Sequence, residues 1–345
     1  MRPQNGHGGK YSKVKILRKL LIALVWLSQS VAGLTFLASG LAKANDPLGM
    51  TILLQDYLGL MGVHTAPGSV PVTACAVVLA LVETALGIGL LIGCCRRRTT
   101  TAMLIFMVPM LIITGYNALT GAVPECGCFG SALHMTNGQS FGKNIVLTAI
   151  AVLLYVCRRS MYGLPGRQNR AWVANVVVVM VGVLGIWSWR HLPMVDFTPY
   201  KTGTDVMAAM MGEYEVVDGK SIEVAAPTIK DFALTDAEGN DLTDDILMAE
   251  QEVTLITIPC EKSADTGNSD RLNSLWDEAC DKGCPFYIVM AEDKAAAEHF
   301  KDRTGLNCPV LFASQEMLQT IVRANPGIVK MKDGIIKEKL SLKHL

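Results

Sequence analysis

Long apolar runs separated by polar connections fill the first half of the chain. Five of these runs are predicted to be helices, at about residues 20–42, 70–93, 100–120, 144–157 and 171–189. A helix needs roughly 20 mostly apolar residues to cross the hydrocarbon core of a bilayer. The fourth run is short, so its helix is expected to begin earlier and to include Phe141 and Gly142. The pattern predicts an α-helical membrane bundle of about five transmembrane helices.

The pattern changes at Ala226, where short β-branched runs begin to alternate with amphipathic segments. Strands are expected at 253–258, 286–290 and 310–312, and helices around Leu272, Leu275 and Trp276, at about 293–304 and at about 315–323. A final pair of strands is joined at Asp333-Gly334, a dipeptide typical of two-residue hairpin turns. This order predicts an α/β domain over residues 226–345, preceded by a linker over 190–225.

Charge divides the chain at the same place as the hydrophobic pattern. Only four of the 31 acidic residues precede residue 191, namely Asp46, Asp56, Glu83 and Glu125. The first part is therefore basic and the second acidic, which indicates two domains in different solvents. The acidic part argues against nucleic acid as a partner, because phosphate binding needs clustered Lys and Arg.

Lysine and arginine in the short connections predict the orientation in the membrane. They are concentrated before the first run, between the second and third, and between the fourth and fifth, and such zones face the cytoplasm. The outer connections, 43–69 and 121–143, hold one base each, Lys43 and Lys143. The expected divisions are a basic cytoplasmic N-terminus over 1–19, a four-helix bundle over 20–160, a fifth helix over 171–189, the linker and the C-terminal domain. We expect the inner membrane of a bacterium, with the C-terminal domain in the periplasm.

Ten cysteines are spread along the chain, and no spacing among them makes a complete zinc site. With this orientation Cys94, Cys95 and Cys157 face the cytoplasm, where thiols stay reduced. Six face the compartment in which disulfides persist: Cys126, Cys128, Cys260, Cys280, Cys284 and Cys308. Cys280 and Cys284 lie at a helix C-terminus, which does not stabilise a thiolate, so we expect a structural disulfide or free thiols there.

The densest chemical signal is Glu125-Cys-Gly-Cys-Phe-Gly130, in which Cys126 and Cys128 are one residue apart. Two thiols this close can form a strained ring, and strained, exposed disulfides exchange readily. The two cysteines are therefore candidate catalytic residues, placed just past a helix end where a quinone or a partner cysteine has access. The alternatives are a static loop disulfide, two unpaired thiols, or metal binding together with His134.

Glu83 lies near the middle of the second apolar run. An ionisable group at that depth costs free energy, which makes it a functional candidate. Gln29, at a similar depth in the first run, is a candidate partner. The alternative is a protonated Glu83 that only joins two helices by a hydrogen bond. The small residues at Ser39-Gly40 and at 87–89 favour close helix packing rather than a site.

Two features of the membrane half resemble a known superfamily. Residues 36–47, Phe-Leu-Ala-Ser-Gly-Leu-Ala-Lys-Ala-Asn-Asp-Pro, resemble the end of the first span in DoxX-like proteins. Glu83 and the Cys-Gly-Cys-Phe-Gly loop resemble the MauE branch, and the similarity covers roughly residues 16–157. MauE proteins are implicated in maturing the disulfide-rich methylamine dehydrogenase, and DoxX relatives are associated with quinol-oxidising complexes. The resemblance implies redox work at the outer face, with a membrane quinone as a candidate cofactor and none bound covalently.

The C-terminal domain resembles the thioredoxin-like proteins related to TlpA and the peroxiredoxins. Residues 226–240, with a turn at Gly239-Asn240, match their opening hairpin, and Pro326 matches the position of their cis-proline. That fold carries Cys-x-x-Cys after its first central strand, where a helix N-terminus lowers the thiol pKa. This chain has Cys260-Glu-Lys-Ser263 there. Cys260 is either a lone nucleophile, resolved by a cysteine elsewhere, or a vestige in a domain that only binds a partner.

Two functions from different classes follow from these features. In a thiol–disulfide oxidoreductase, reducing equivalents would pass between Cys260, the Cys126/Cys128 pair and a membrane carrier such as quinone, in the maturation of an extracytoplasmic client protein. In a non-catalytic envelope assembly factor, the thioredoxin-like domain would hold the client without turnover. Only the relay requires Cys126 and Cys128 to change oxidation state. A small-solute transporter has Glu83 alone in its favour.

Overall fold

The computed structural model describes residues 8–123, 135–164, 166–217 and 220–344. The chain divides into two compact units, one made of residues 1–63 and 74–186 and the other of residues 64–73 and 187–345. The long helices form the first unit, and the sheets belong to the second.

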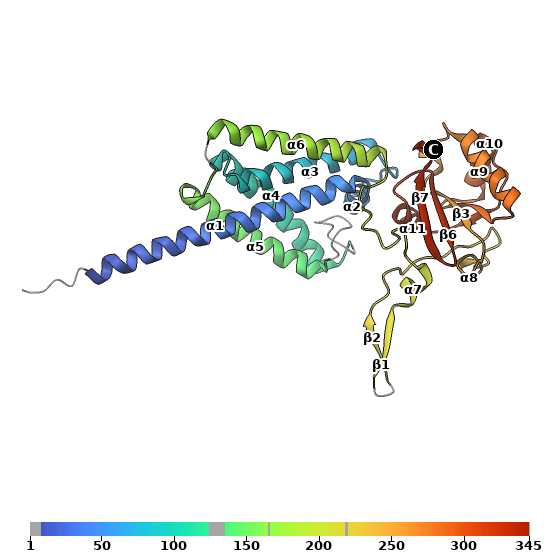
Figure 1. Ribbon diagram of the computed structural model, residues 1–345, viewed down its shortest axis with the longest axis horizontal. Coiled ribbons are helices and arrows are strands. Elements are labelled where there is room, and N and C mark those ends of the chain that lie inside the picture. The colour runs from blue at the N-terminus through green and yellow to red at the C-terminus, as the bar shows by residue number, and fades with distance from the viewer. Residues whose placement is uncertain (1–7, 124–134, 165, 218–219, 345) are drawn as a thin grey trace, which may run out of the picture. The chain divides into compact units, whose positions relative to one another are not determined.

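Six helices make up the membrane part: α1 Gly8–Asn45, α2 Pro47–Leu60, α3 Val70–Leu91, α4 Arg96–Thr120, α5 Asn137–Val156 and α6 Arg167–Arg190. Within the described residues, five of them, all but α2, are long and apolar enough to cross a membrane. They lie side by side, except that the N-terminal part of α1 extends beyond the other four (Figure 1). The predicted bundle of about five candidate transmembrane helices is confirmed.

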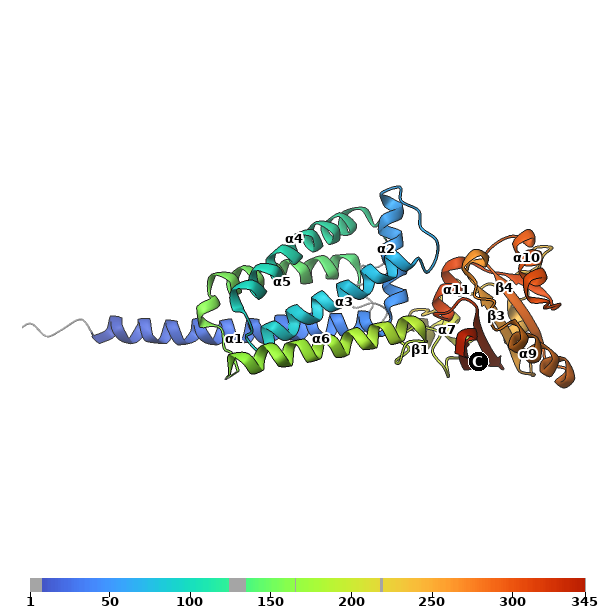
Figure 2. The same cartoon turned by 90° about the horizontal axis from the view of Figure 1, so that it is seen from above.

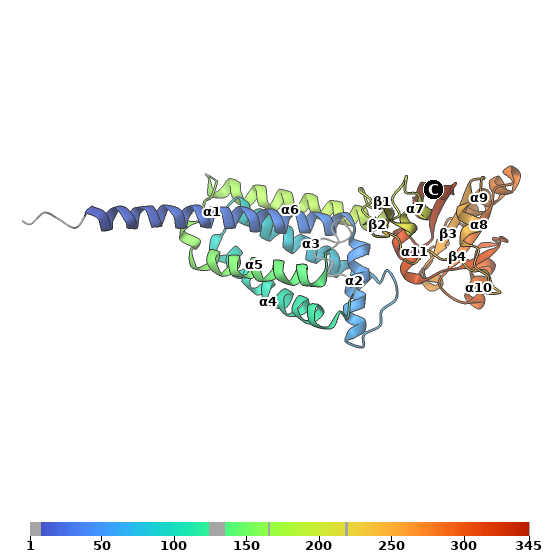
Figure 3. The same cartoon turned by 90° about the horizontal axis from the view of Figure 1, so that it is seen from below.

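Helix α2 occupies part of what the sequence pattern treated as a connection. It runs across the ends of the long helices instead of along them (Figures 2 and 3). Asp46 caps it by accepting a hydrogen bond from the Gly49 amide (2.8 Å), and Pro47 fills its first position. Because α1 continues to Asn45, Lys43 belongs to a helix and not to the outer connection in which it was expected.

Helix α5 begins before its apolar run, as expected, and includes Phe141 and Gly142. Its start is set by a capping box: the Thr136 hydroxyl accepts from the Gln139 amide, and the Gln139 side chain accepts from the Thr136 amide. This cap satisfies backbone donors that the first turn leaves unpaired.

Small residues bring α1 and α3 into close contact. A Cβ on Gly87 would lie 2.5 Å from the Leu37 backbone nitrogen, and one on Gly40 would overlap the Thr84 hydroxyl. These glycines therefore act in helix packing, as the pattern indicated. Ser39, grouped with them in the sequence, has a different role that is described with the site.

The C-terminal unit is built on a five-stranded mixed sheet in the order β5-β4-β3-β6-β7. Its strands are β3 Val253–Ile258, β4 Phe286–Met290, β5 Val310–Phe312, β6 Gly327–Lys332 and β7 Ile335–Ser341. Strands β3, β4 and β5 are parallel, whereas β6 and β7 are antiparallel to their neighbours. The helices are α9 Ser269–Lys282, α10 Lys294–Thr304 and α11 Gln315–Ile321. This is the predicted thioredoxin-like order, and it confirms the fold class.

Both faces of the sheet are covered, which explains why the central strand is buried throughout and carries no charged residue. Every residue of β3 is buried. Leu255 packs into the core that includes residues of α11, whereas Ile256 and Ile258 pack against residues of α9 and α10. A strand buried on both faces has no polar alternation.

Three local features of this unit differ from the predictions or refine them. An antiparallel pair, β1 Glu213–Val217 and β2 Lys220–Ala225, lies in the region expected to be a linker. The expected hairpin at 231–240 is a tight turn closed by a single bridge between Thr235 and Asp241. Short helices α7 Val206–Met211 and α8 Thr243–Leu247 complete the unit, and Met207 and Met210 of α7 pack against the core.

Candidate functional site

Cys126 and Cys128 lie outside the described residues, but the two ends of the segment that contains them are well defined. The Asn117 side chain donates to the Val123 carbonyl (3.0 Å) and to Asn137 Oδ1 (2.9 Å), and its own oxygen accepts from the Val123 amide (2.8 Å). Asn137 also donates to the Val123 carbonyl (3.1 Å). A buried asparagine thus joins the end of α4 to the start of α5. Sequence reasoning missed Asn117 because its partners, Val123 and Asn137, lie across a connection whose geometry no local pattern shows.

Glu83 is part of a buried ion pair between α3 and α1. Lys43 Nζ lies 3.0 Å from Oε1 and 2.8 Å from Oε2 of Glu83, and Ser39 donates to Oε2 (2.7 Å). Lys43 also donates to Ser39 (2.7 Å), and it is 1% exposed while Glu83 is 3% exposed. A buried carboxylate is tolerated when an opposite charge and hydrogen bonds compensate it. Lys43 was missed as a partner because it was taken for a loop residue.

Gln29 is not the partner of Glu83, so that prediction is wrong. Its amide nitrogen donates to the carbonyls of Leu90 (2.7 Å) and Tyr162 (3.1 Å), and its oxygen accepts from the Tyr162 amide (3.1 Å). Gln29 therefore fixes the end of α3 and the connection to α6. The depth of Gln29 in the membrane did not reveal these partners, because Gln29 contacts a different neighbour from Ser39 and Lys43.

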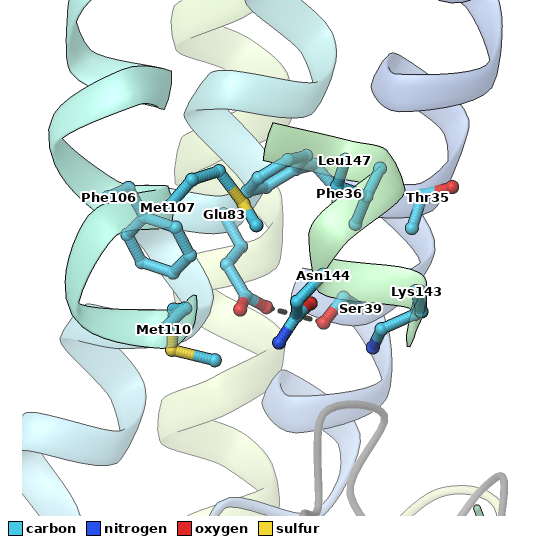
Figure 4. Close-up of a pocket in the computed structure, with 10 residues that line it drawn as sticks. All are labelled: Thr35, Phe36, Ser39, Glu83, Phe106, Met107, Met110, Lys143, Asn144 and Leu147. Carbon is cyan, nitrogen blue, oxygen red and sulfur yellow. Dashed lines mark hydrogen bonds between the residues drawn. The ribbon is translucent and has the colours of Figure 1, made fainter. Parts of the chain in front are cut away.

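A small cavity of about 30 Å³ lies beside Glu83. Four helices contribute to its wall, and Figure 4 shows Glu83, Ser39, Asn144 and Lys143 with their polar ends gathered on one side. Asn144 is held there by a hydrogen bond to Thr114 Oγ1 (3.1 Å). The cavity combines a charged pair with neutral polar groups inside an otherwise apolar bundle.

The second site surrounds Cys260, which directly follows the central strand β3. Cys260 is 7% exposed. The Asn325 side chain donates to the Cys260 carbonyl (2.7 Å) and to Ser263 Oγ (2.9 Å). The Asn325–Pro326 peptide bond, before the candidate cis-proline, is cis. The fold thus brings the candidate nucleophile, the serine of its motif and the proline loop into direct contact.

The local structure after Cys260 differs from the helix N-terminus that the resemblance implied. Residues Glu261–Ser263 form one 3₁₀ turn, and α9 begins only at Ser269. The α-helix dipole that stabilises a thiolate acts within the first turn of a helix. Cys260 is therefore not at the start of α9.

Glu261 anchors the Cys260 segment to α10, and sequence reasoning did not find this cluster. Its carboxylate oxygen Oε1 lies 2.7 Å from Arg303 Nη1 and 2.8 Å from His299 Nδ1, and its amide donates to Glu292 Oε2 (2.6 Å). Burial opposes ionisation of Glu261, but hydrogen bonds and charge from His299 and Arg303 hold its pKa below the ordinary value. His299 and Arg303 lie 38 and 42 residues after Glu261 in the sequence, so no local pattern links them to it.

The other cysteines of the C-terminal unit are free thiols in the structure, among them Cys280 and Cys284. Cys308 is buried, and burial raises the pKa of its thiol to about 12. The thiolate is the nucleophile in disulfide exchange, so Cys308 is unsuited to resolve a disulfide on Cys260. Cys280 is exposed.

Comparison with known proteins bears on each half of the chain. The family described as "Methylamine utilisation protein MauE" matches residues 21–157. No curated protein matches the chain. Among solved structures, a putative protein disulfide isomerase from Bacteroides thetaiotaomicron is similar, with 18% identity over 33% of this chain and 76% of that one and a TM-score of 0.25. The match shows that residues 21–157, the α1–α5 part of this membrane protein, resemble the MauE family.

Proposed function

We propose that the protein is a membrane-bound thiol–disulfide relay that matures extracytoplasmic client proteins. The observation that carries this proposal is the contact between Asn325 and Cys260, which sets the loop of the cis-proline beside a cysteine at the end of the central strand. In a thioredoxin-like domain this arrangement presents one thiol to an extended partner. The MauE match supports the membrane half as the other partner of the relay.

The chemistry of the relay is thiol–disulfide exchange. The Cys260 thiolate attacks one sulfur of a Cys126–Cys128 disulfide, so that a mixed disulfide forms and the other sulfur leaves as a thiolate, which takes up a proton. A client thiolate then attacks Cys260, and a second client thiolate releases it. The client dithiol is oxidised to a disulfide and the Cys126/Cys128 pair is reduced to two thiols, so electrons and protons balance.

The motif of Cys260 suits this role of carrier. Ser263 stands where a second cysteine would resolve the mixed disulfide, so the intermediate lasts until another thiol attacks it. Cys308 does not supply that thiol, because its pKa of about 12 keeps it protonated. The remaining candidates for resolution are Cys280, Cys284, the membrane pair and the client.

A membrane quinone is the proposed acceptor that would reoxidise the Cys126/Cys128 pair by taking up two electrons and two protons. The cavity beside Glu83 measures about 30 Å³, which is room for water and not for a quinone ring. That cavity does not fit the group, and no step of the relay is assigned to it.

The orientation belongs to the same proposal. Basic residues in the short connections favour a cytoplasmic N-terminus in a bacterial inner membrane. The segment from 124 to 134 and the thioredoxin-like domain then face the periplasm, where disulfides persist. The client is a protein of that compartment that requires disulfides.

The second candidate is an assembly factor that binds a client without turnover. It is favoured by the start of α9 at Ser269, well after Cys260, because no α-helix N-terminus then stabilises a thiolate there. In that case Cys260 would be a buried structural residue and the domain a binding module.

Capture of mixed disulfides in membranes separates the two candidates. Free thiols are blocked with an alkylating reagent, and disulfide-linked adducts of the wild type, Cys260→Ser and Cys308→Ser are compared with and without reductant. The relay predicts reductant-sensitive adducts in the wild type that Cys260→Ser loses and Cys308→Ser keeps. Adducts that are absent, or unchanged in Cys260→Ser, would support the assembly factor.

A further inference from the structure

The relay makes no use of the ion pair between Lys43 and Glu83. Glu83 Oε2 accepts hydrogen bonds from both Ser39 and Lys43, whereas Oε1 accepts one, from Lys43, among the described residues. Each oxygen of an ionised carboxylate has two lone pairs. Oε1 therefore keeps room for one more donor, and Glu83 lines the cavity.

The cavity is of the right size and character to hold water. A water molecule needs roughly 10–15 Å³ by the same measure and two to four polar partners. The volume of about 30 Å³ accommodates about two waters, and Thr35, Ser39 and Asn144 line it together with Glu83 (Figure 4). Most of the lining is apolar, and Glu83, Ser39 and Asn144 supply the polar partners that a water molecule needs.

Charge decides which ligand the cavity takes. Among the described residues, Lys43 from α1 is bonded to the Glu83 carboxylate, and Lys143 from α5 lines the cavity with Glu83, while α4 contributes Phe106, Met107 and Met110. Lys43 already compensates the charge of the Glu83 carboxylate, which disfavours a metal cation there. The volume excludes an organic molecule. Water, and the protons that water carries, are the remaining occupants.

The cavity also lies close to one end of the bundle. Lys143 and Asn144 follow Asn137, the residue bound to Val123 at the start of α5, by about two helical turns, or about 10 Å at 1.5 Å per residue. Lys43 lies two residues before the end of α1. A short water path from that end is sufficient to reach Glu83.

We propose that Glu83 is a proton-relay group of the membrane bundle, which exchanges protons with the aqueous phase through water in this cavity. In the forward step an O–H bond forms at Oε1 and the O–H bond of a protonated water breaks. The reverse step restores the carboxylate. No electron moves, so the site needs no oxidant or reductant and does not depend on the relay proposed for the cysteines.

Infrared spectroscopy of the full chain in lipid nanodiscs tests this assignment. Lys43→Gln removes the ammonium group that is hydrogen-bonded to both oxygens of Glu83, so the variant is expected to show the carbonyl band of a protonated carboxyl group. The double variant Lys43→Gln/Glu83→Gln lacks that band and thereby assigns it. Transfer into deuterated buffer should shift the band at least about tenfold faster than the backbone amides of α3 exchange, because those require opening of the helix.

A second variant tests the path itself. Leu147 lines the cavity, so Leu147→Phe in the Lys43→Gln background fills it and should slow the deuterium shift of the Glu83 band. Ile112→Phe, at an exposed position on α4, is the matched control and should leave the rate unchanged.

Two results overturn the proposal. One is the absence of a Glu83 carboxyl band in Lys43→Gln, and the other is deuteration as slow as that of the α3 amides. If Lys43→Gln does not fold, the wild type in acidic buffer, with Glu83→Gln for assignment, gives the same readout. These results are independent of the oxidation state of any cysteine, so failure of the relay and failure of the proton site are distinguishable.

Discussion

The ammonium group of Lys43 lies 2.8 Å from Glu83 Oε2, and both side chains are buried within the helical bundle. The ion pair links α1 to α3, and the glycines of the two helices allow their backbones to pack closely. Removing one member of a buried pair leaves the other charge uncompensated, whereas removing both leaves none.

For this pair we expect Lys43→Met to lower the free energy of unfolding by about 3–5 kcal/mol. The double variant Lys43→Met/Glu83→Leu should recover most of that loss, because no isolated charge remains. The measurement is reversible unfolding in detergent or bicelles. It compares the wild type, Lys43→Met, Glu83→Leu and the double variant. Additive effects of the two single changes would show that the residues do not interact.

Gly87 provides a test of helix packing in the same unit. A Cβ there would lie 2.5 Å from the Leu37 nitrogen and 2.9 Å from the Gly33 carbonyl oxygen, so Gly87→Ala must separate α1 from α3. We expect a loss of about 1–3 kcal/mol. Gly142→Ala is the control, since nothing lies within 4 Å of its Cβ position. Equal thermal stability of the two variants would contradict the close approach.

Glu261 makes the stability of the C-terminal unit depend on pH. Burial would raise the pKa of Glu261, but His299 and Arg303 hold it below the ordinary value of about 4.3. A lowered folded-state pKa contributes stability that is fully present above the unfolded value and is lost as the pH falls through the folded one.

We therefore expect Glu261→Gln to cost about 1–2 kcal/mol at about pH 7, with a difference that shrinks below about pH 4. Hydrogen exchange of β3 peptides in the full chain, compared at each pH, measures it. Glu298→Gln, on the exposed side of α10, is the control. A penalty that stays constant with pH would mean that the carboxylate charge has no part in the anchor.

Ser263 provides a test of the carrier role of Cys260. Ser263 and Cys260 are both bound by Asn325, and Ser263 donates to the Cys260 carbonyl (3.4 Å). Ser263→Cys places a thiol next to any mixed disulfide on Cys260, so we expect at least about a tenfold loss of trapped adducts, in line with fast intramolecular exchange. Ser263→Ala should keep them. Adducts that persist in Ser263→Cys would contradict attack within the motif.

Elements with strong local patterns were predictable from the sequence. The strands Val253–Ile258, Phe286–Met290 and Val310–Phe312 lie where the apolar β-branched runs placed them, and Asp333-Gly334 makes the final turn with positive φ at both residues. Helix α2 was missed because its 14 residues are too few to span a bilayer, although Asp46 and Pro47 mark its start in the sequence.

The contacts of the site were less predictable, because they join residues far apart in the sequence. Glu83 was found from its charge in an apolar run, but its partner Lys43 is 40 residues away and sits at a helix end that resembled a loop. The wrong partner, Gln29, lay at the right depth on another side of α1. The Glu261–Arg303 pair depends on how α10 packs beside the Cys260 segment, which no local pattern encodes.

The central claim is that Cys126 and Cys128 exchange electrons with Cys260. Its most direct test is the fraction of the Cys126/Cys128 pair that is oxidised in isolated membranes, measured with an alkylating mass tag in the wild type and in Cys260→Ser, with Cys308→Ser as control. The relay predicts a partly oxidised pair whose oxidised fraction rises in Cys260→Ser, because the pair then loses its route to client thiols. A pair that stays in one state in all three proteins would contradict the relay.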